Sequence, residues 1–313
     1  MGSVWASVAR YVEVVKAWGR NRTEHFRVRW PWFDHLLRTV HRYQTRHGDR
    51  LAGAVTYFAF LSFFPVLALG FAVAGYVVSI NAAAEETLIA AVNQQLPGLA
   101  DSLNIKELSD ARAGAGVIGL LGLLYAGIGA VDALREALHD ISDSREAPTN
   151  WFAGRGRDLV ALVLIGLTFV LSVSVGGFAN AATSTVLGWF GLAATPLAVF
   201  LVWVAGLLIS IAADMLVFLV ILGWLGKVGK SLKTLLRGAL VGAVGFGVLK
   251  LAATLLLAHT LTNPVYGAFA LVAGLLLYIN FSARWIMYTA AWTATAEGAP
   301  PPEPSPVPTS EYV

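Results

Sequence analysis

The chain has 313 residues, of which 57% are hydrophobic and 13% are charged, and its mean hydropathy is +0.67. Soluble domains carry about 25% charged residues, so this composition excludes a soluble globular protein and indicates an integral membrane protein. The formal net charge is +3. The absence of cysteine excludes disulfides, thiolate metal sites and thiol catalysis.

Residues 1–50 form a predicted basic N-terminal region, cytoplasmic or interfacial, that is dense in Arg, Trp and His. They do not resemble a signal peptide, which needs a short apolar core followed by a cleavage site. Within this region, residues 32–47 are predicted to form an amphipathic helix at the inner interface. Arg38, Arg42 and Arg46 lie on one face, and the apolar face carries Phe33, Leu36, Leu37, Val40 and Tyr43. This helix either binds anionic lipid headgroups or acts only as an orientation signal.

Residues 51–296 are predicted to form an all-α membrane domain of six transmembrane helices. Each apolar stretch is near or above the ~20 residues that a helix needs to cross the hydrocarbon. Residues 81–112, on the outer side, have the pattern of two short amphipathic helices, and the Pro-rich residues 297–313 are predicted to be a disordered cytoplasmic tail. The predicted spans are 51–80, 113–131, 159–187, 193–223, 238–261 and 264–292.

The distribution of Lys and Arg predicts the orientation. Residues 1–50 hold ten of these residues, and the predicted loops 132–158 and 224–237 hold four each. Residues 81–112 hold two, against five acids. By the positive-inside rule both termini are expected in the cytoplasm, which agrees with an even number of spans.

Three charges stand out between the ends of the spans: Asp214, Lys250 and Arg284. From the ~1.5 Å rise per residue, Asp214 and Lys250 lie about 15 and 20 Å from the cytoplasmic ends of their spans. A lysine side chain covers this difference, so we expect an Asp214–Lys250 pair inside the bundle. Arg284 is expected at the inner interface, either as an anchor or facing an inner vestibule with Arg135.

One feature of the first span is a candidate gate. Pro65 is expected to bend the helix next to Ser62. Prolines are also tolerated in membrane helices without any gating role.

Enzyme motifs are absent from the sequence: there is no Walker loop, GxSxG or HExxH. His35, His41 and His47 recur every six residues, which turns each one about 120° from the last on a helix. They therefore do not converge on a metal. We expect no catalytic residues, no metal, no cofactor and no nucleic-acid partner.

Three segments carry a family resemblance. Residues 49–70 (DRLAGAVTYFAFLSFFPVLALG), 133–141 (ALREALHDI) and 265–286 (VYGAFALVAGLLLYINFSARWI) resemble, in the same order, the YihY/BrkB family of bacterial inner-membrane proteins. Arg135 makes the sequence look closer to the YhjD branch. Two positions depart from the family pattern: YTAAWTAT lacks a glutamate near the end of the last span, and His139 stands at an Asn position.

The resemblance implies an inner-membrane protein associated with envelope integrity and, for the YhjD branch, with moving lipids. The older label ribonuclease BN finds no support, since no nuclease metal site can be built from this sequence. Two functions stay open. One is a transporter or flippase of a lipid or other anionic amphiphile, with Lys250, Asp214, Arg135 and Arg284 as substrate-binding candidates. The other is a non-transporting scaffold for envelope proteins. The expected partners are membrane lipids, with their anionic headgroups at the inner leaflet, and the sequence predicts no oligomeric state.

Overall fold

The computed structural model describes residues 18–19, 22–80, 105–144, 154, 156, 159–164, 166, 196–228, 230–260 and 267–297. Within these residues every regular element is a helix, which confirms the all-α prediction for this part of the chain. The elements are α2 (Pro31–Thr45), α3 (Gly48–Ile80), α5 (Ile105–Ser142), α7 (Pro196–Leu219), the π-helix η2 (Val220–Leu225), α8 (Leu232–Thr260) and α9 (Gly267–Thr295).

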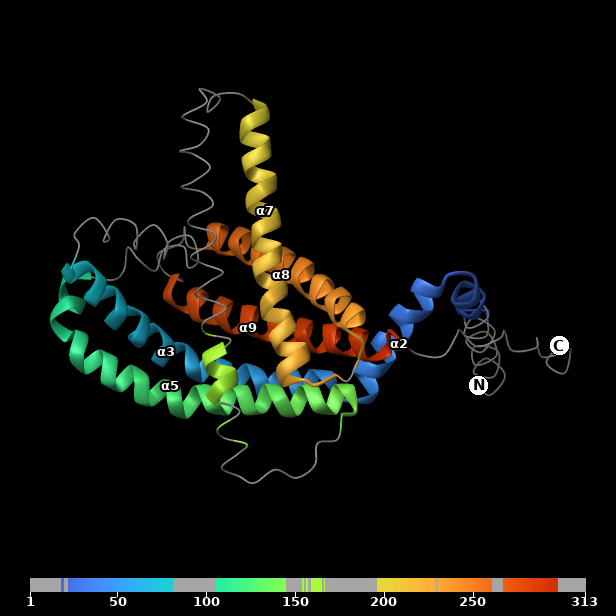
Figure 1. Cartoon of the computed structure of the whole chain (residues 1–313), viewed down its shortest axis with the longest axis horizontal. Coiled ribbons are helices and arrows are strands. Elements are labelled where there is room, and N and C mark those ends of the chain that lie inside the picture. Colours follow the sequence, from blue (N-terminus) through green and yellow to red (C-terminus); the bar gives the residue numbers. More distant parts are fainter. Residues whose placement is uncertain are drawn as a thin grey trace, which may run out of the picture.

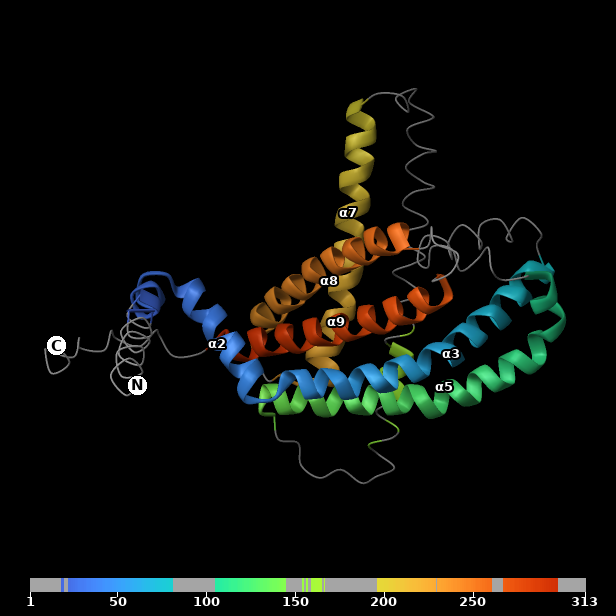
Figure 2. The same cartoon turned by 180° about the vertical axis from the view of Figure 1, so that it is seen from behind.

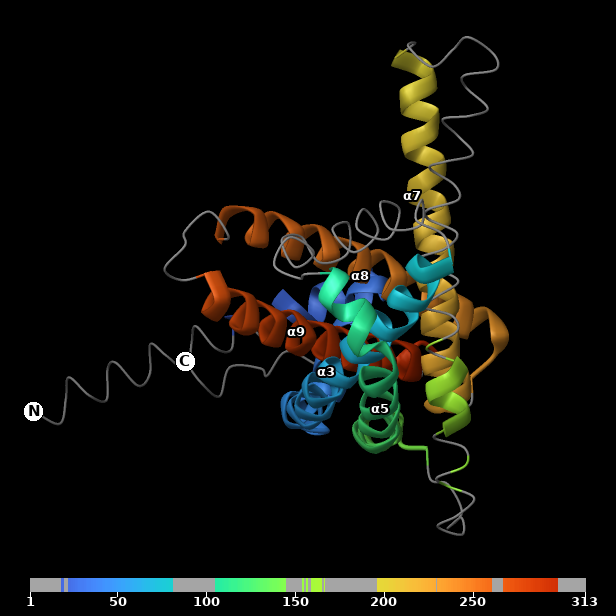
Figure 3. The same cartoon turned by 90° about the vertical axis from the view of Figure 1, so that its left-hand side faces the viewer.

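The helices pack in the order α5, α3, α9, α8, α7. Helices α3, α5 and α9 run side by side along the long axis (Figures 1 and 2), whereas α7 stands steeply across them (Figure 3). The starts of α3 and α8 and the ends of α5 and α9 meet at one end of this bundle. There α2 packs on α9 and α3.

Two described segments are long and apolar enough to cross a membrane, Val204–Leu225 and Leu232–Ala253. Of the third predicted span, only residues 159–164 and 166 are described. Residues 81–104 and the predicted tail from residue 298 onward lie outside the described residues.

The helices extend beyond the predicted spans into the segments that the sequence assigned to loops. Helix α5 runs to Ser142, so that Arg135 lies in a helix rather than in the predicted loop 132–158. Helix α8 begins at Leu232, six residues before the predicted start of its span. The physical reason is that a helix satisfies its own backbone on either side of the membrane boundary, and long charged side chains near its ends reach water. Charge therefore marks the membrane boundary and not the helix end.

The most deeply buried side chains lie near the end of the bundle that α2 contacts. Leu138 and Ile141 of α5, Leu222 of η2 and Met287 of α9 are fully buried in one cluster. Because three elements share these residues, the cluster holds η2, which directly follows α7, against α5 and α9.

Glycines on α8 admit large side chains from both neighbouring helices. A Cβ added at Gly242 would clash with the ring of Phe218 on α7, and one added at Gly245 would clash with the indole of Trp285 on α9. The Trp285 indole nitrogen also donates a hydrogen bond of 3.0 Å to the Gly242 carbonyl oxygen. Small residues let membrane helices approach in this way, so α8 is held between α7 and α9 at short range.

Candidate functional site

The central feature of the candidate site is an ion pair between α7 and α8. The Lys250 ammonium donates to both carboxylate oxygens of Asp214, at 2.7 and 2.9 Å. The contact expected from the depths of the two residues is therefore present. Lys250 lies 18 residues after the start of α8, about 27 Å along the helix.

The two partners differ in exposure. The Asp214 side chain is 5% exposed and the Lys250 side chain is 36% exposed. The carboxylate is thus covered, while part of the ammonium side chain faces outward. The basic partner is therefore the more exposed member of the pair.

Among the described residues, an aromatic ring also lies beside the ammonium. The Lys250 nitrogen lies 4.9 Å from the centroid of the Phe246 ring, one turn earlier on α8. Phe246 in turn neighbours Phe218 of α7 and Tyr278 of α9, with ring centroids 6.0 and 6.3 Å away. A cation over an aromatic face is stabilised electrostatically and keeps an apolar wall beside it. The Lys250 ammonium therefore lies between the Asp214 carboxylate and the Phe246 ring.

The other two charged candidates lie nearer the end of the bundle. Arg284 of α9 pairs with Asp49 at the start of α3, at 3.4 Å. Arg135 of α5 pairs with Asp132, one turn earlier on the same helix. The structure thus divides the four predicted residues between two depths, with Asp214 and Lys250 deep along α7 and α8 and each arginine held by an acid of its own.

Asp49 also ties α2 to the bundle. The Tyr43 hydroxyl donates to the Asp49 carboxylate at 2.8 Å, and the Tyr43 ring stacks on Tyr288 of α9 with centroids 3.8 Å apart. Burial and the neighbouring Asp49 raise the pKa of the Tyr43 hydroxyl, which keeps it protonated as the donor. Arg284 therefore meets an acid whose position is fixed by α2.

The two gate candidates lie on α3. Ser62 is buried, and its hydroxyl donates to the carbonyl oxygen of Phe58 one turn earlier, at 2.8 Å. The Pro65 ring lies against Gly122 of α5, where an added Cβ would come within 3.0 Å of it. A gating role for these residues stays a prediction.

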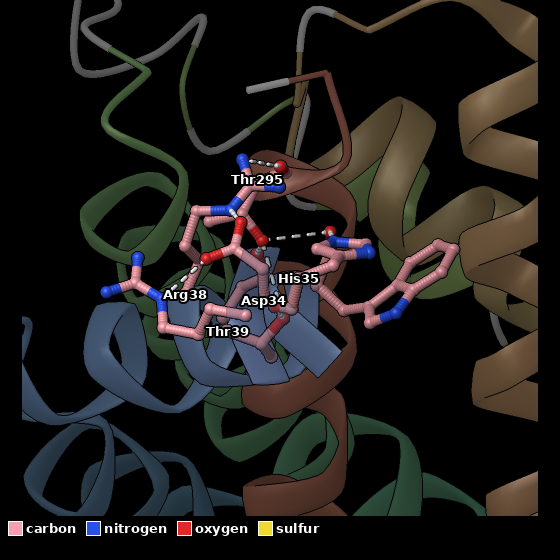
Figure 4. A network of polar contacts seen from close by, with 8 residues as sticks. Asp34, His35, Arg38, Thr39 and Thr295 are labelled. Carbon is pink, nitrogen blue, oxygen red and sulfur yellow. Dashed lines mark hydrogen bonds and ion pairs between the residues drawn. The ribbon is translucent and has the colours of Figure 1, made fainter. Parts of the chain in front are cut away.

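Helix α2 carries a buried carboxylate between two arginines. Asp34 is 1% exposed and pairs with Arg27 at 2.7 Å and with Arg38 at 2.9 Å. Figure 4 shows this network beside the end of α9. The His35 ring donates to the Trp292 carbonyl oxygen at 2.9 Å, and Arg38 donates to that of Thr295 at 3.3 Å. Burial lowers the pKa of His35.

The arginine face of α2 is turned toward the protein. Arg42 donates to the carbonyl oxygen of Ile141 at the end of α5, at 2.7 Å, and Arg46 pairs with Asp143 just beyond it, at 2.9 Å. The ends of helices carry unpaired carbonyl groups and partial negative charge, so guanidinium groups are stabilised there. Part of the expected apolar face points outward instead: Leu36 and Val40 are exposed, together with Trp32.

A carboxylate beyond α9 caps the start of α8. The side chain of Glu297 accepts hydrogen bonds from the hydroxyls of Ser231 and Thr234, each at 2.7 Å, and from the Ser231 backbone at 3.2 Å. The hydrogen bond from Thr234, followed by those from Ser231, lowers the pKa of Glu297. Glu297 was predicted to begin the disordered tail, whereas its side chain links the end of α9 to the start of α8.

Comparison with known proteins gives consistent matches over most of the chain. The family described as Virulence factor BrkB matches residues 39–311. The chain belongs to the BrkB family. It is 31% identical over 278 residues, 86% of this chain and 82% of the relative, to inner membrane protein YhjD of Escherichia coli (strain K12). It is 33% identical over 279 residues, 85% of this chain and 84% of the relative, to an uncharacterized protein of Dickeya dadantii (strain 3937). No solved structure matches.

This BrkB-family chain is an inner-membrane protein, as its resemblance to the family implied. Within the described residues, no group of three or more His, Asp or Glu side chains is placed to hold a metal. Three acidic residues that link helices through ion pairs or hydrogen bonds were not predicted from the sequence: Asp34, Asp49 and Glu297. Only Asp34 had a local signal, since Arg38 follows it at the i,i+4 spacing of a helical ion pair.

Proposed function

We propose that this BrkB-family membrane protein moves an anionic amphiphile, such as a lipid, across the inner membrane and so contributes to envelope integrity. The observation that carries the proposal is the unequal exposure of the deep ion pair, with Asp214 covered and Lys250 partly open. Charges within the membrane are costly and mark binding sites or pathways more often than packing. The proposed role is not enzymatic and uses no cofactor.

Each member of the pair has a part in this proposal. Lys250 meets the anionic headgroup, and the Phe246 ring beside it provides an apolar surface for the part of the molecule next to that headgroup. Asp214 holds the ammonium in place while the site is empty. Arg135 and Arg284, each paired with an acid near the end of the bundle, are the further binding candidates of this proposal.

The proposal includes six spans with both termini in the cytoplasm. Helices α3 and α8 begin, and α5 and α9 end, at the same end of the bundle. This alternation in direction supports helices that cross the membrane back and forth. The basic side chains of α2 lie at that same end, as the positive-inside rule requires of the cytoplasmic side. The exposed Trp32, Leu36 and Val40 suit α2 to contact with lipids of the inner leaflet.

A non-transporting scaffold is the second candidate, and the two-oxygen contact of Lys250 with Asp214 favours it. In that case the pair only joins α7 to α8, and envelope proteins are the partners. A structural pair tolerates exchange of its two members better than a site that must attract an anion.

The test is scrambling of a fluorescent phosphatidylglycerol by purified protein in liposomes. We expect the wild type to exceed empty liposomes and Lys250→Ala to fall to their level. Lys233→Ala, an exposed lysine near the start of the same helix, serves as the control and should match the wild type. Scrambling that survives the double exchange Asp214→Lys with Lys250→Asp contradicts an anion site at Lys250. Absence of scrambling by the wild type favours the scaffold.

A further inference from the structure

The ion pair raises a problem of charge when an anion binds. Among the described residues the ion pair is neutral, because one carboxylate faces one ammonium at hydrogen-bond distance. An anion at Lys250 leaves the site with two negative groups and one positive group. Asp214 is 5% exposed, so water cannot offset the excess charge, and an uncompensated buried carboxylate is strongly disfavoured.

We propose that binding of an anion at Lys250 is coupled to the uptake of one proton by Asp214. This inference rests on the proposed function and names the ion that drives it. In the empty state the carboxylate is charged and holds the ammonium. In the loaded state the ammonium holds the anion, and the carboxyl oxygen that has lost its partner carries a proton taken from water. The charges balance, since the anion and the proton enter together and the site stays neutral.

The groups that face Asp214 favour this exchange. On α8 the facing group is the Lys250 ammonium, which the incoming anion engages. On α9 it is the Tyr278 hydroxyl, which makes no hydrogen bond to the Asp214 carboxylate and interacts with it electrostatically. The rings of Phe218 on α7 and Phe246 on α8 lie edge to face nearby, with centroids 6.0 Å apart. Once the ammonium turns to the anion, these neighbours supply no positive charge, so a proton is the compensation that the surroundings allow.

The charge balance of the site also favours one class of substrate. A monoanionic headgroup requires one proton and leaves the site neutral, whereas a dianionic headgroup leaves a residual charge beside the Phe246 ring. The preferred substrate is therefore a monoanionic amphiphile, of which phosphatidylglycerol is a simple probe. A gradient of protons then drives its movement.

The test is calorimetric titration of the purified protein in detergent with dihexanoyl phosphatidylglycerol, in two buffers of different ionisation enthalpy. The difference between the two heats gives the number of protons taken up. For the wild type we expect about one proton per bound lipid near neutral pH, with Kd rising roughly tenfold per pH unit. Asp214→Asn carries a neutral side chain of the same shape, so it should take up no proton and its Kd should not change with pH.

Asp140→Asn is the matched control, because this carboxylate of α5 is exposed, and it should behave as the wild type does. Binding without proton uptake by the wild type, or proton uptake that persists in Asp214→Asn, overturns the coupling and leaves the proposed transport intact. Absence both of binding at every pH and of scrambling in liposomes overturns the transport function and the coupling together.

Discussion

Two glycines five residues apart on α8 should respond in opposite ways to the same methyl group. A Cβ at position 242 meets the ring of Phe218, which is 2% exposed and so has no route into solvent. A Cβ at position 247 meets nothing within 4 Å. Gly242→Ala should therefore destabilise the protein, whereas Gly247→Ala should be neutral or stabilising.

The magnitude follows from two contributions. Overpacking of a filled interior costs about 1–3 kcal/mol. Displacement of the helix also weakens the hydrogen bond of 3.0 Å from Trp285 to the Gly242 carbonyl, a net loss of about 0.5–1.5 kcal/mol. The gain in helix propensity on replacing Gly by Ala applies to both variants and cancels in the comparison. The variants should thus differ by about 1.5–4.5 kcal/mol in the free energy of unfolding.

The measurement is equilibrium unfolding in mixed micelles with an increasing fraction of SDS, followed by circular dichroism. Gly247→Ala is the internal control, because it carries the same chemical change on the same helix. Equal stability of the two variants would refute the close packing of α8 against Phe218 and Trp285.

Four further outcomes are expected. Arg42→Ala removes the 2.7 Å hydrogen bond to the Ile141 carbonyl oxygen. It should lower the free energy of unfolding by about 1.5–3 kcal/mol, the range for a hydrogen bond to a charged group, which thermal unfolding measures. Lys250→Met should cost about 3 kcal/mol, because it strands a buried carboxylate, and adding Asp214→Asn should restore most of the loss in a double-mutant cycle. The pKa of His35 is lowered in the folded protein, so the unfolded chain binds a proton more readily than the folded one. The free energy of unfolding should therefore fall as the pH drops below the ordinary pKa of 6.5. His35→Gln should lack this fall. Glu297 also has a lowered pKa, so its contribution is present above the ordinary value of 4.5 and should be lost as the pH drops below it, and Glu297→Gln should lack this step in unfolding curves.

The first three of these outcomes have a control or a result that would contradict them. Arg29→Ala removes an exposed guanidinium of the same region and should leave stability unchanged. A loss in the Lys250→Met, Asp214→Asn double variant as large as the sum of the single losses would contradict the pairing. A His35→Gln variant that keeps the full loss of stability between pH 7 and 6 would assign that loss to another group.

The sequence predicts features that depend only on the spacing of apolar residues and on position along a single helix. Apolar spacing locates α2, and the rise per residue brings Asp214 and Lys250 to similar depths, because both quantities are properties of a single helix. The direction in which α2 presents its arginines is not encoded locally. The acceptors are carbonyl groups at the ends of α5 and α9, and every residue type carries a carbonyl, so no sequence pattern marks them.

Helix ends were predicted poorly for a related reason. The apolar pattern of a span stops where the hydrocarbon stops, but the hydrogen bonds of the helix continue into the interface. Lys233 and Arg237 were therefore assigned to a loop although both lie in α8. Glu297 was missed because its partners, Ser231 and Thr234, become neighbours only when α8 and α9 pack together.

The contacts of α2 with α9 impose an order on biosynthesis. His35 and the Trp292 carbonyl are 257 residues apart in the chain. At about 5–20 residues per second, roughly 10–50 s pass between the synthesis of one partner and that of the other. Throughout that interval His35 and Arg38 lack their acceptors on α9, and α2 can adopt its final position only after the last helix has left the ribosome. A nascent chain that stops before α9 therefore has the α2 contacts with α3 and the end of α5, but it lacks the carbonyl acceptors of His35 and Arg38.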